Sequence, residues 1–378
     1  MKKALRKIDF KKLLTLFSFI AISVLVYSHS LTDFNTAVAS SSVFVDKIER
    51  NDGWGVPAVD PETSKIYVTN FKSTTVTVID GNTNKAVTEI EVGSSPYGIE
   101  INTDTKMLYV AREHADILSI VNITSGMIVK EIPLMEPYDI AVNSKTNKVY
   151  VTSDKSHLVS VLDGSTNEIV ATYDVAVPCG IGVNEKTNMV YVTSESTNKL
   201  YVFDGAKNSL VTTIDVGKSP RGIVANPRTN MVYVTNQLSG TVDVIDGTKN
   251  KVVDTITVGT TPRRVVVNTD TNILYVSNQI SNSLSVIDGS TNTVIDSIPV
   301  EQPFELVINP ITNKLYATYF GSPLLSIVND VIREQEQKYD YEPIIGILAA
   351  GALSGGIAYF TIQKKKLKSK SRFTKSDS

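Results

Sequence analysis

The central part of the chain alternates short apolar runs with polar turns, and this pattern recurs at a nearly constant interval. One unit contains four runs rich in Val, Ile, Thr and Tyr: Arg221–Asn226, Met231–Asn236, Thr241–Asp246 and Val252–Val258. Runs of β-branched and aromatic residues are typical of strands, and the Asn, Asp and Gly residues between them favour tight turns. Four strands in about 40–45 residues predict one blade of a β-propeller.

The unit is present seven times. A tyrosine of the second run marks each copy, at intervals of 41 or 42 residues: Tyr67, Tyr109, Tyr150, Tyr191, Tyr233, Tyr275 and Tyr316. An Asp or Asn follows each tyrosine by 13 residues, and a proline precedes it by 13, with Trp54 replacing the first proline. These fixed offsets predict an all-β, seven-bladed propeller of four-stranded antiparallel blades over residues 41–330.

The last repeat lacks its own fourth run after Ser326–Val328, and the segment Val43–Arg50 has the composition of the missing strand. When the copies are aligned on their tyrosines, Ile48 takes the place of Ile256 and Val45 that of Val253. We therefore expect the N-terminal strand to complete the seventh blade and close the ring, which removes an exposed sheet edge.

Residues 1–40 are typical of an export signal. A basic start is followed by the apolar run Leu13–Tyr27, whose 15 residues suit a signal segment better than a full membrane span. Ala37-Val38-Ala39 fits a small-residue cleavage site, but it lies well beyond the apolar run. Cleavage after Ala39 and a retained signal anchor both remain open.

A second apolar segment follows the repeats. After a juxtamembrane linker over 331–343, residues 344–362 form an uncharged run long enough for a transmembrane helix, and residues 363–378 form a basic tail. Because positive charge stays on the cytoplasmic side, this pattern predicts a cell-membrane protein with a single C-terminal span and an extracellular propeller. Gly351 and Gly355 form a GxxxG step that lets two spans dimerise, although small residues are common in any membrane span.

Charge and composition exclude several classes of partner. Removing the thirteen basic and four acidic residues of the two ends leaves 24 Lys/Arg and 35 Asp/Glu between them. An acidic body repels phosphate backbones, so we expect no nucleic-acid partner. Cys179 is the single cysteine, and only three histidines are present, so the sequence predicts no disulfide, no bound metal and no cofactor.

The repeat resembles the YVTN β-propeller family. The resemblance rests on Tyr67-Val68-Thr69-Asn70 and Tyr233-Val234-Thr235-Asn236, on the Val-Ile-Asp-Gly runs, and on Val-Gly-x-x-Pro before the first strands. It implies a secreted or cell-surface location of the kind found in surface-layer proteins. The fold is also similar to lactonase-type and quinoprotein-type propellers, but a shared fold implies no shared activity.

Candidate functional residues lie where the repeats differ. We expect two sets of loops to share one face, the first directly after the marker proline at the channel mouth and the second after the tyrosine strand. Aromatic rings and arginines there suit sugars, carboxylates or protein side chains, although a varied, solvated loop face would look the same. The candidate ligand contacts are Tyr97, Tyr138, Arg221, Arg263 and Phe304, with Arg112, Glu113 and His114 as a polar cluster.

Two functions from different classes follow from this face. The first is a surface binding, adhesion or structural module whose partner is an extracellular protein or glycan. The alternative is a lactonase-like, metal-dependent hydrolase, for which Glu113, His114, Asp154 and Glu195 would have to converge at the channel mouth. The Asp of each Val-Ile-Asp-Gly run is expected to cap a turn rather than bind calcium, and Asn122-Ile-Thr124 matches an N-glycosylation sequon.

Overall fold

The computed structural model describes residues 45–49, 53, 55–319, 322 and 324–329. The chain divides into the units Met1–Ile332 and Arg333–Ser378, and every described residue belongs to the first. The predicted export signal and the predicted span over 344–362 lie outside the described residues. Within the described ranges, no helix has the length and apolar character needed to cross a membrane.

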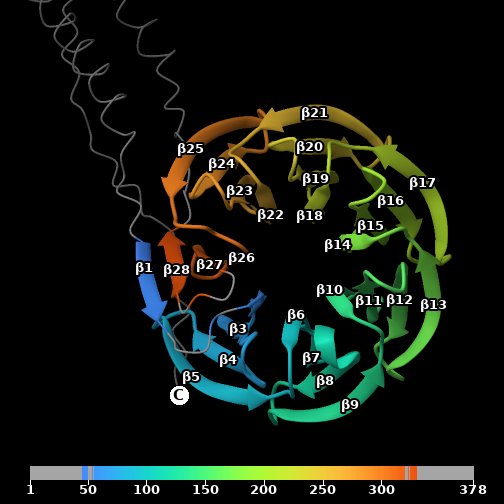
Figure 1. The fold of residues 1–378 in the computed structure, drawn as a ribbon, viewed down its shortest axis with the longest axis vertical. Coiled ribbons are helices and arrows are strands. Elements are labelled where there is room, and N and C mark those ends of the chain that lie inside the picture. Colours follow the sequence, from blue (N-terminus) through green and yellow to red (C-terminus); the bar gives the residue numbers. More distant parts are fainter. Residues whose placement is uncertain (1–44, 50–52, 54, 320–321, 323, 330–378) are drawn as a thin grey trace, which may run out of the picture. The chain divides into compact units, whose positions relative to one another are not determined.

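Seven four-stranded antiparallel sheets form a closed ring (Figure 1). The first blade contains β2 (Pro57–Asp60), β3 (Lys65–Thr69), β4 (Thr75–Asp80) and β5 (Lys85–Glu91). The second contains β6 (Pro96–Asn102), β7 (Met107–Arg112), β8 (Ile117–Asn122) and β9 (Met127–Pro133), with a 3₁₀ turn, η2 (Glu113–Ala115), after β7. The third contains β10 (Pro137–Asn143), β11 (Lys148–Ser153), β12 (Leu158–Asp163) and β13 (Glu168–Asp174).

The remaining blades repeat this order. The fourth contains β14 (Pro178–Asn184), β15 (Met189–Ser194), β16 (Lys199–Asp204) and β17 (Ser209–Asp215). The fifth contains β18 (Pro220–Asn226), β19 (Met231–Asn236), β20 (Thr241–Asp246) and β21 (Lys251–Thr257). The sixth contains β22 (Pro262–Asn268), β23 (Ile273–Asn278), β24 (Ser283–Asp288) and β25 (Thr293–Pro299). The seventh contains β26 (Leu306–Asn309), β27 (Lys314–Thr318), β28 (Leu324–Asn329) and β1 (Val45–Glu49).

The predicted strand boundaries are largely confirmed. In the fifth blade the second and third strands have the predicted limits, while the first begins one residue earlier, at Pro220, and the fourth is shifted by one residue. The pairing of β18 with β19 is bulged between Pro220 and Ile223. This bulge re-aims the first strand where it meets the channel, which places consecutive residues there on the channel wall.

The N-terminal strand closes the ring, as predicted. β1 pairs antiparallel with β28, and Ile48 lies opposite Leu325 just as Ile256 lies opposite Val242 in the fifth blade. The register differs at the other end of the strand. Val45 lies opposite Val328, whereas a bulge between Val244 and Ile245 shifts the equivalent pairing of the fifth blade by one residue. The expected equivalence of Val45 with Val253 is therefore wrong, because β1 pairs without that bulge.

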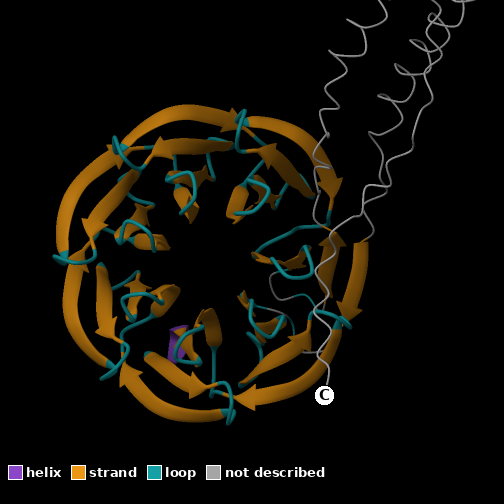
Figure 2. Cartoon of the chain, turned by 180° about the vertical axis from the view of Figure 1, so that it is seen from behind, coloured by secondary structure: helices purple, strands orange, loops and turns teal. Residues whose placement is uncertain are grey.

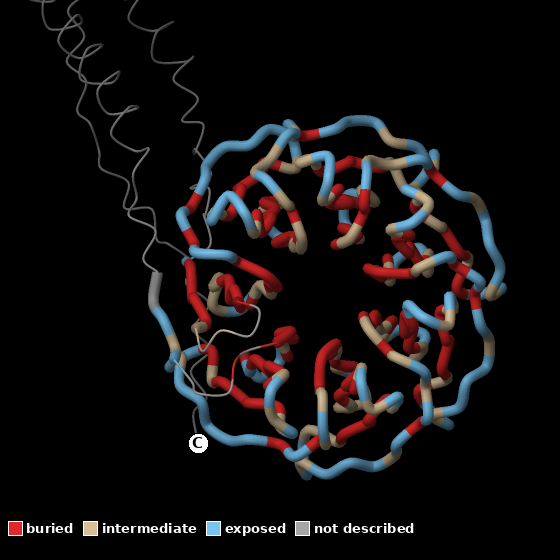
Figure 3. The backbone as a smooth tube through the Cα atoms, viewed as in Figure 1, coloured by how far each residue is buried: buried red, intermediate tan, exposed pale blue. Residues whose placement is uncertain are grey.

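Burial follows the radial order of the strands (Figure 3). The second and third strands of each blade are almost entirely buried, and the fourth strand forms the exposed rim. The marker tyrosines belong to the apolar clusters between neighbouring blades, and most of them are fully buried. The hydrophobic core is therefore a ring of inter-blade interfaces, and each blade depends on both neighbours.

In five blades a threonine two residues after the tyrosine joins one blade to the next, while Ser277 takes this position in the sixth blade and Ala111 in the second. The threonine hydroxyl donates to a backbone carbonyl at the start of the next blade's first strand, for example from Thr193 to Arg221 (2.9 Å) and from Thr235 to Arg263 (2.8 Å). The same bond closes the ring, because Thr318 donates to the carbonyl of Gly55 over 2.7 Å. A repeated sequence feature thus fixes the backbone at the channel mouth.

The turns between the third and fourth strands have the predicted form (Figure 2, teal). The Oδ1 atom of Asp246 accepts the backbone N–H groups of Thr248 and Lys249, and Asp163 accepts two N–H groups in the same way. These bonds lower the pKa of the Asp163 carboxyl. Asn122 makes the same turn, with its Oδ1 atom bonded to the N–H groups of Thr124 and Ser125. The repeated aspartates therefore act as turn caps.

Candidate functional site

Each blade contributes one residue to a ring at the channel mouth, in or just before its first strand and twelve positions before the marker tyrosine. This mouth ring consists of Gly55, Tyr97, Tyr138, Cys179, Arg221, Arg263 and Phe304. Five of these residues line one pocket at the axis. The second predicted loop set lies beside the ring, since the N–H of Glu195 donates to Val177 and that of Gln237 to Ser219. The prediction that both loop sets share one face is confirmed.

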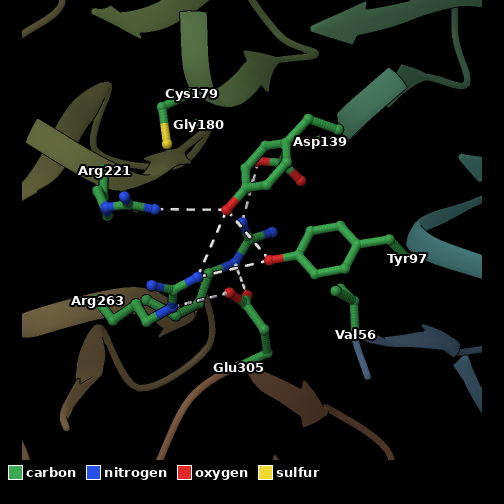
Figure 4. Close-up of a pocket in the computed structure, with 11 residues that line it drawn as sticks. Val56, Tyr97, Asp139, Cys179, Gly180, Arg221, Arg263 and Glu305 are labelled. Atoms are coloured by element: carbon green, nitrogen blue, oxygen red, sulfur yellow. Dashed lines mark hydrogen bonds and ion pairs between the residues drawn. The ribbon is translucent and has the colours of Figure 1, made fainter. Parts of the chain in front are cut away.

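The aromatic and basic residues of the mouth ring meet at the axis rather than on opposite sides of it (Figure 4). The Tyr97 hydroxyl donates to the Tyr138 hydroxyl over 3.1 Å, and the two rings lie 4.9 Å apart. The Arg263 guanidinium donates to both hydroxyls at 3.4 Å and stacks 3.5 Å from the centre of the Phe304 ring. Arg263 thus reaches across the channel mouth to the aromatic residues of the ring.

Two residues of the second loop set, Glu195 and Gln237, hold the Arg221 side chain. Its Nη2 atom lies 3.1 Å from a carboxylate oxygen of Glu195, and its Nε atom donates to Gln237 over 3.0 Å. A further donor atom reaches the Tyr138 hydroxyl at 3.4 Å. The Arg221 side chain remains about one-fifth exposed, so it forms part of the accessible face of the mouth.

A second ring lies directly beneath the mouth, one residue further along each repeat. Three of its members are charged: Asp139, Arg264 and Glu305. Arg264 bridges the two acids, with its Nη1 atom 3.1 Å from Asp139 and its Nε atom 3.4 Å from Glu305. Burial lowers the pKa of Arg264, but the carboxylates of Asp139 and Glu305 more than reverse this effect and raise it. Arg264 is therefore charged at any pH at which the protein is folded.

The mouth and the channel below it differ greatly in free space. Among the side chains of the mouth and the charged ring the free volume is only about 20 Å³, enough for one water molecule. The remainder of the channel is lined by the later residues of all seven first strands and has a volume of about 490 Å³. Arg264 lines both spaces, so the tyrosines and arginines form a plug between the mouth face and a wide cavity.

The predicted polar cluster is only partly assembled at this face. Arg112 is buried within its own blade, where it pairs with Glu131 on β9 and donates through Nε to the carbonyl of Ser94. His114 is exposed on η2, and its ring lies 6.3 Å from that of Phe71, which in turn packs 5.9 Å from Tyr97. Burial raises the pKa of the Glu113 carboxyl beside it. The structure thus places Glu113 and His114 at the edge of the face and Arg112 away from it.

Cys179 occupies the mouth ring but is buried, and burial raises the pKa of its thiol to about 11. At neutral pH it is therefore a protonated, weakly reactive thiol. Of the residues proposed for a hydrolase, Glu195 is engaged in the ion pair with Arg221. Among the side chains that the structure describes, no three His, Cys, Asp or Glu residues are grouped so as to hold a metal ion.

Sequence reasoning missed the charged ring and one residue of the cavity wall, Glu100. The signal was available, because aligned repeats place glycine at three of the seven charged-ring positions and charged residues at three others. Asp139, Arg264 and Glu305 follow closely after the repeated turn motifs, where charged residues usually lie on the surface. The bulge that turns both the mouth residue and its successor toward the axis is not visible in a simple strand alternation.

Comparisons with known proteins bear on the fold. No family model matches the chain, and no curated protein sequence matches it. Among solved structures, it is similar to a chain of the hydrazine synthase of Kuenenia stuttgartiensis, with a TM-score of 0.67, 16% identity, and coverage of 75% of this chain and 98% of that one. It is also similar to a chain from a mitotic checkpoint complex, with a TM-score of 0.68, 10% identity, and coverage of 75% and 90%. At these identities the similarity shows a shared propeller fold alone.

Proposed function

We propose that this protein is a binding module of the cell surface, with a propeller of the YVTN type displayed outside the membrane and anchored by residues 344–362. The basic segment after that span supports this orientation. The closed ring supports a role in recognition, because it holds the loops of one face on a rigid scaffold.

One observation carries the proposed binding role: Tyr138, Arg221 and Arg263 are held together at the centre of the mouth face while staying partly exposed. Arginine donors in a fixed plane beside tyrosine hydroxyls suit a carboxylate on a glycan or a polypeptide. The plug leaves no room for a ligand to enter the mouth deeply. We therefore propose a ligand that lies across the face and presents its acidic group to Arg221.

Binding to an array of carboxylated and neutral glycans, together with acidic and neutral peptides, tests this proposal with the purified full chain. We expect carboxylated ligands to bind and the Arg221→Ala variant to lose at least tenfold in affinity. Arg228→Ala is the matched control, because Arg228 is an exposed arginine of a turn at the other end of a first strand. Equal binding of neutral ligands, or equal loss in both variants, would exclude the mouth face as an anion-binding site.

Protease treatment of intact cells tests the proposed topology separately. The propeller should be accessible from outside, and the 363–378 tail should be protected. A chain truncated after residue 340 should be released from the membrane if the signal is cleaved, and retained if residues 1–40 act as an anchor. Retention of the tail on the outer side would contradict the proposed orientation.

A further inference from the structure

The cavity below the plug is large enough for a small ligand. Its volume of about 490 Å³ lies within the range of small-molecule sites, and the first strands of all seven blades contribute to its wall. It opens at the ends of these strands, on the face opposite the mouth ring. The site is therefore distinct from the proposed binding face, and the inference below does not rest on that function.

One ring of the cavity wall is apolar except at a single position. The residues that pair with the seven marker tyrosines all line the cavity: Ala58, Glu100, Ala141, Gly182, Val224, Val266 and Val307. Six of them are aliphatic or glycine, and only Glu100 is charged. A lone carboxyl in an apolar ring costs free energy when it ionises, so its presence calls for an explanation beyond packing.

The charge balance of the cavity favours a cation. Its charged lining residues are Glu100, Glu185 and Arg264. The guanidinium of Arg264 is already shared between Asp139 and Glu305 in the charged ring above. In the described part of the chain no cation forms an ion pair with Glu100, whose Oε1 atom accepts the backbone N–H of Ile101 over 3.0 Å. The cavity thus has an excess of negative charge next to an apolar wall.

We propose that this cavity binds a small primary alkylammonium ligand, whose charged group donates to Glu100 and whose alkyl chain lies against the alanine and valine wall. The NH₃⁺ group matches a carboxylate that has no cationic partner, and the aliphatic wall accommodates the chain. The small residues Ala58 and Ala141 occupy the ring positions of the two neighbouring blades, and they leave space beside Glu100.

The protonation of Glu100 supports this assignment and gives a specific readout. Burial raises the pKa of its carboxyl to about 7, against the opposing effects of the Ile101 N–H and Arg264, while Asp139 and Glu185 add to the rise. Near neutral pH the empty site is therefore only partly ionised. An ammonium ligand favours the ionised carboxylate, so binding should release a fraction of a proton, about half at pH 7.

Calorimetric titration of the full chain with n-pentylammonium chloride tests the proposal, with 1-pentanol as a neutral probe of similar shape. Titrations in two buffers of different ionisation enthalpy count the released protons. We expect the amine to bind with proton release and the alcohol to bind at least tenfold more weakly. Glu100→Gln should lower the affinity for the amine at least tenfold and abolish proton release, whereas Glu185→Gln should change it less than about threefold.

A second variant separates occupancy of the cavity from effects on folding. Gly182→Leu adds bulk to the wall at a position where a Cβ atom meets only ordinary contacts, 3.5 Å from Ile223. It should block amine binding while thermal unfolding stays cooperative. The proposal is overturned if the alcohol binds as tightly as the amine, if neither binds at millimolar concentration, or if Glu100→Gln binds the amine normally. Displacement of the amine by calcium chloride through Glu100 would assign the site to a metal ion and would overturn it as well.

Discussion

At the scale of single residues, the channel shows how a propeller can bury charge at its axis. The Arg264 side chain is about four-fifths buried, yet it stays ionised because Asp139 and Glu305 neutralise it at distances of 3.1 and 3.4 Å. Removing one partner of such a buried group leaves the others without compensation, which is far more costly than losing an exposed pair.

Arg264→Met should therefore lower the free energy of unfolding by about 3–5 kcal/mol, because it leaves the buried Asp139 carboxyl without a cationic partner and leaves Glu305 with only the 3.8 Å contact to Arg263. Burial raises the pKa of the Glu305 carboxyl and Arg264 opposes this rise, so without the guanidinium the loss of stability should be larger at pH 8 than at pH 5. Urea unfolding at both pH values measures it. Arg228→Met, which removes an exposed pair with Asp270, should cost less than about 1 kcal/mol. Similar losses in the two variants would mean that Arg264 does not compensate the buried carboxyls of Asp139 and Glu305.

A neutral replacement of Glu100 should have the opposite effect and raise the free energy of unfolding at high pH. Its folded-state pKa of about 7 lies above the ordinary value of 4.5, so the native protein binds the extra proton between these values and loses stability as the pH rises through them. Glu100→Gln removes this loss. The variant should match the parent near pH 5 and exceed it by about 2 kcal/mol at pH 8, as measured by urea unfolding. A gain that is the same at both pH values would contradict the assigned protonation.

These residues also show how far the sequence could predict the site. Tyr138, Arg221 and Arg263 were identifiable because the mouth ring sits at a fixed offset from the marker tyrosine. The position of the Arg112 side chain inside its blade could not be predicted. Its partner Glu131 lies on the outermost strand of that blade, and no local sequence pattern links the two residues. The division of the channel into a filled plug and an open cavity depends on side-chain conformations across the axis, which the repeat alone does not specify.

At the scale of strands and turns, the repeated motif has a physical reason at each position. The tyrosine fills the space between blades, the threonine hydroxyl bonds to the next blade, and the aspartate caps the turn that follows. Because each role is local and recurs, the strand order could be predicted from the sequence, and the strand limits of the fifth blade could be predicted to within one residue. The departures are bulges, such as the one between Val244 and Ile245, which depend on the twist of the finished sheet.

The inter-blade hydroxyl bond gives a direct test at this scale. Thr235 accepts the N–H of Gly222 and donates to the carbonyl of Arg263, both over 2.8 Å. Thr235→Val keeps the shape but leaves these buried groups unpaired, so it should destabilise the fold by about 1–3 kcal/mol in thermal unfolding. Thr257→Val, on the exposed outer strand of the same blade, should change stability by less than about 0.5 kcal/mol. Equal effects would show that the hydroxyl bond is unimportant.

At the scale of the whole molecule, both ends of the repeat array meet in the seventh blade. β1 adds the outer strand next to β28, and Ile48 packs into the cluster that joins the seventh blade to the first, which includes Ile66 and Tyr316. A ring closed in this way has no terminal blade, so we expect the segment 41–340 to fold alone as a soluble monomer that unfolds in one transition.

Deleting residues 43–50 from that segment should destabilise the entire ring, because the seventh blade loses a strand and the interface with the first blade loses Ile48. Ile48→Asp should also lower the thermal stability of the ring, but by less than the deletion. Glu49→Gln, on the exposed side of β1, should have little effect on it. Differential scanning calorimetry measures all three. An unchanged transition after the deletion would mean that the ring closes without β1.

Closure of the ring by the N-terminal strand is the claim on which both the mouth face and the cavity depend, and a cross-link tests it most directly. Glu49 and Leu324 lie opposite each other across β1 and β28, a separation that a disulfide can span. In the full chain with Cys179 replaced by Ser, the pair Glu49→Cys and Leu324→Cys should oxidise rapidly and run as a compact, reducible species on a gel. The control pair Glu49→Cys and Ser283→Cys, at the same position of the neighbouring blade, should not. Cross-linking of the control instead of the test pair, or of neither, would contradict the closed seven-bladed ring.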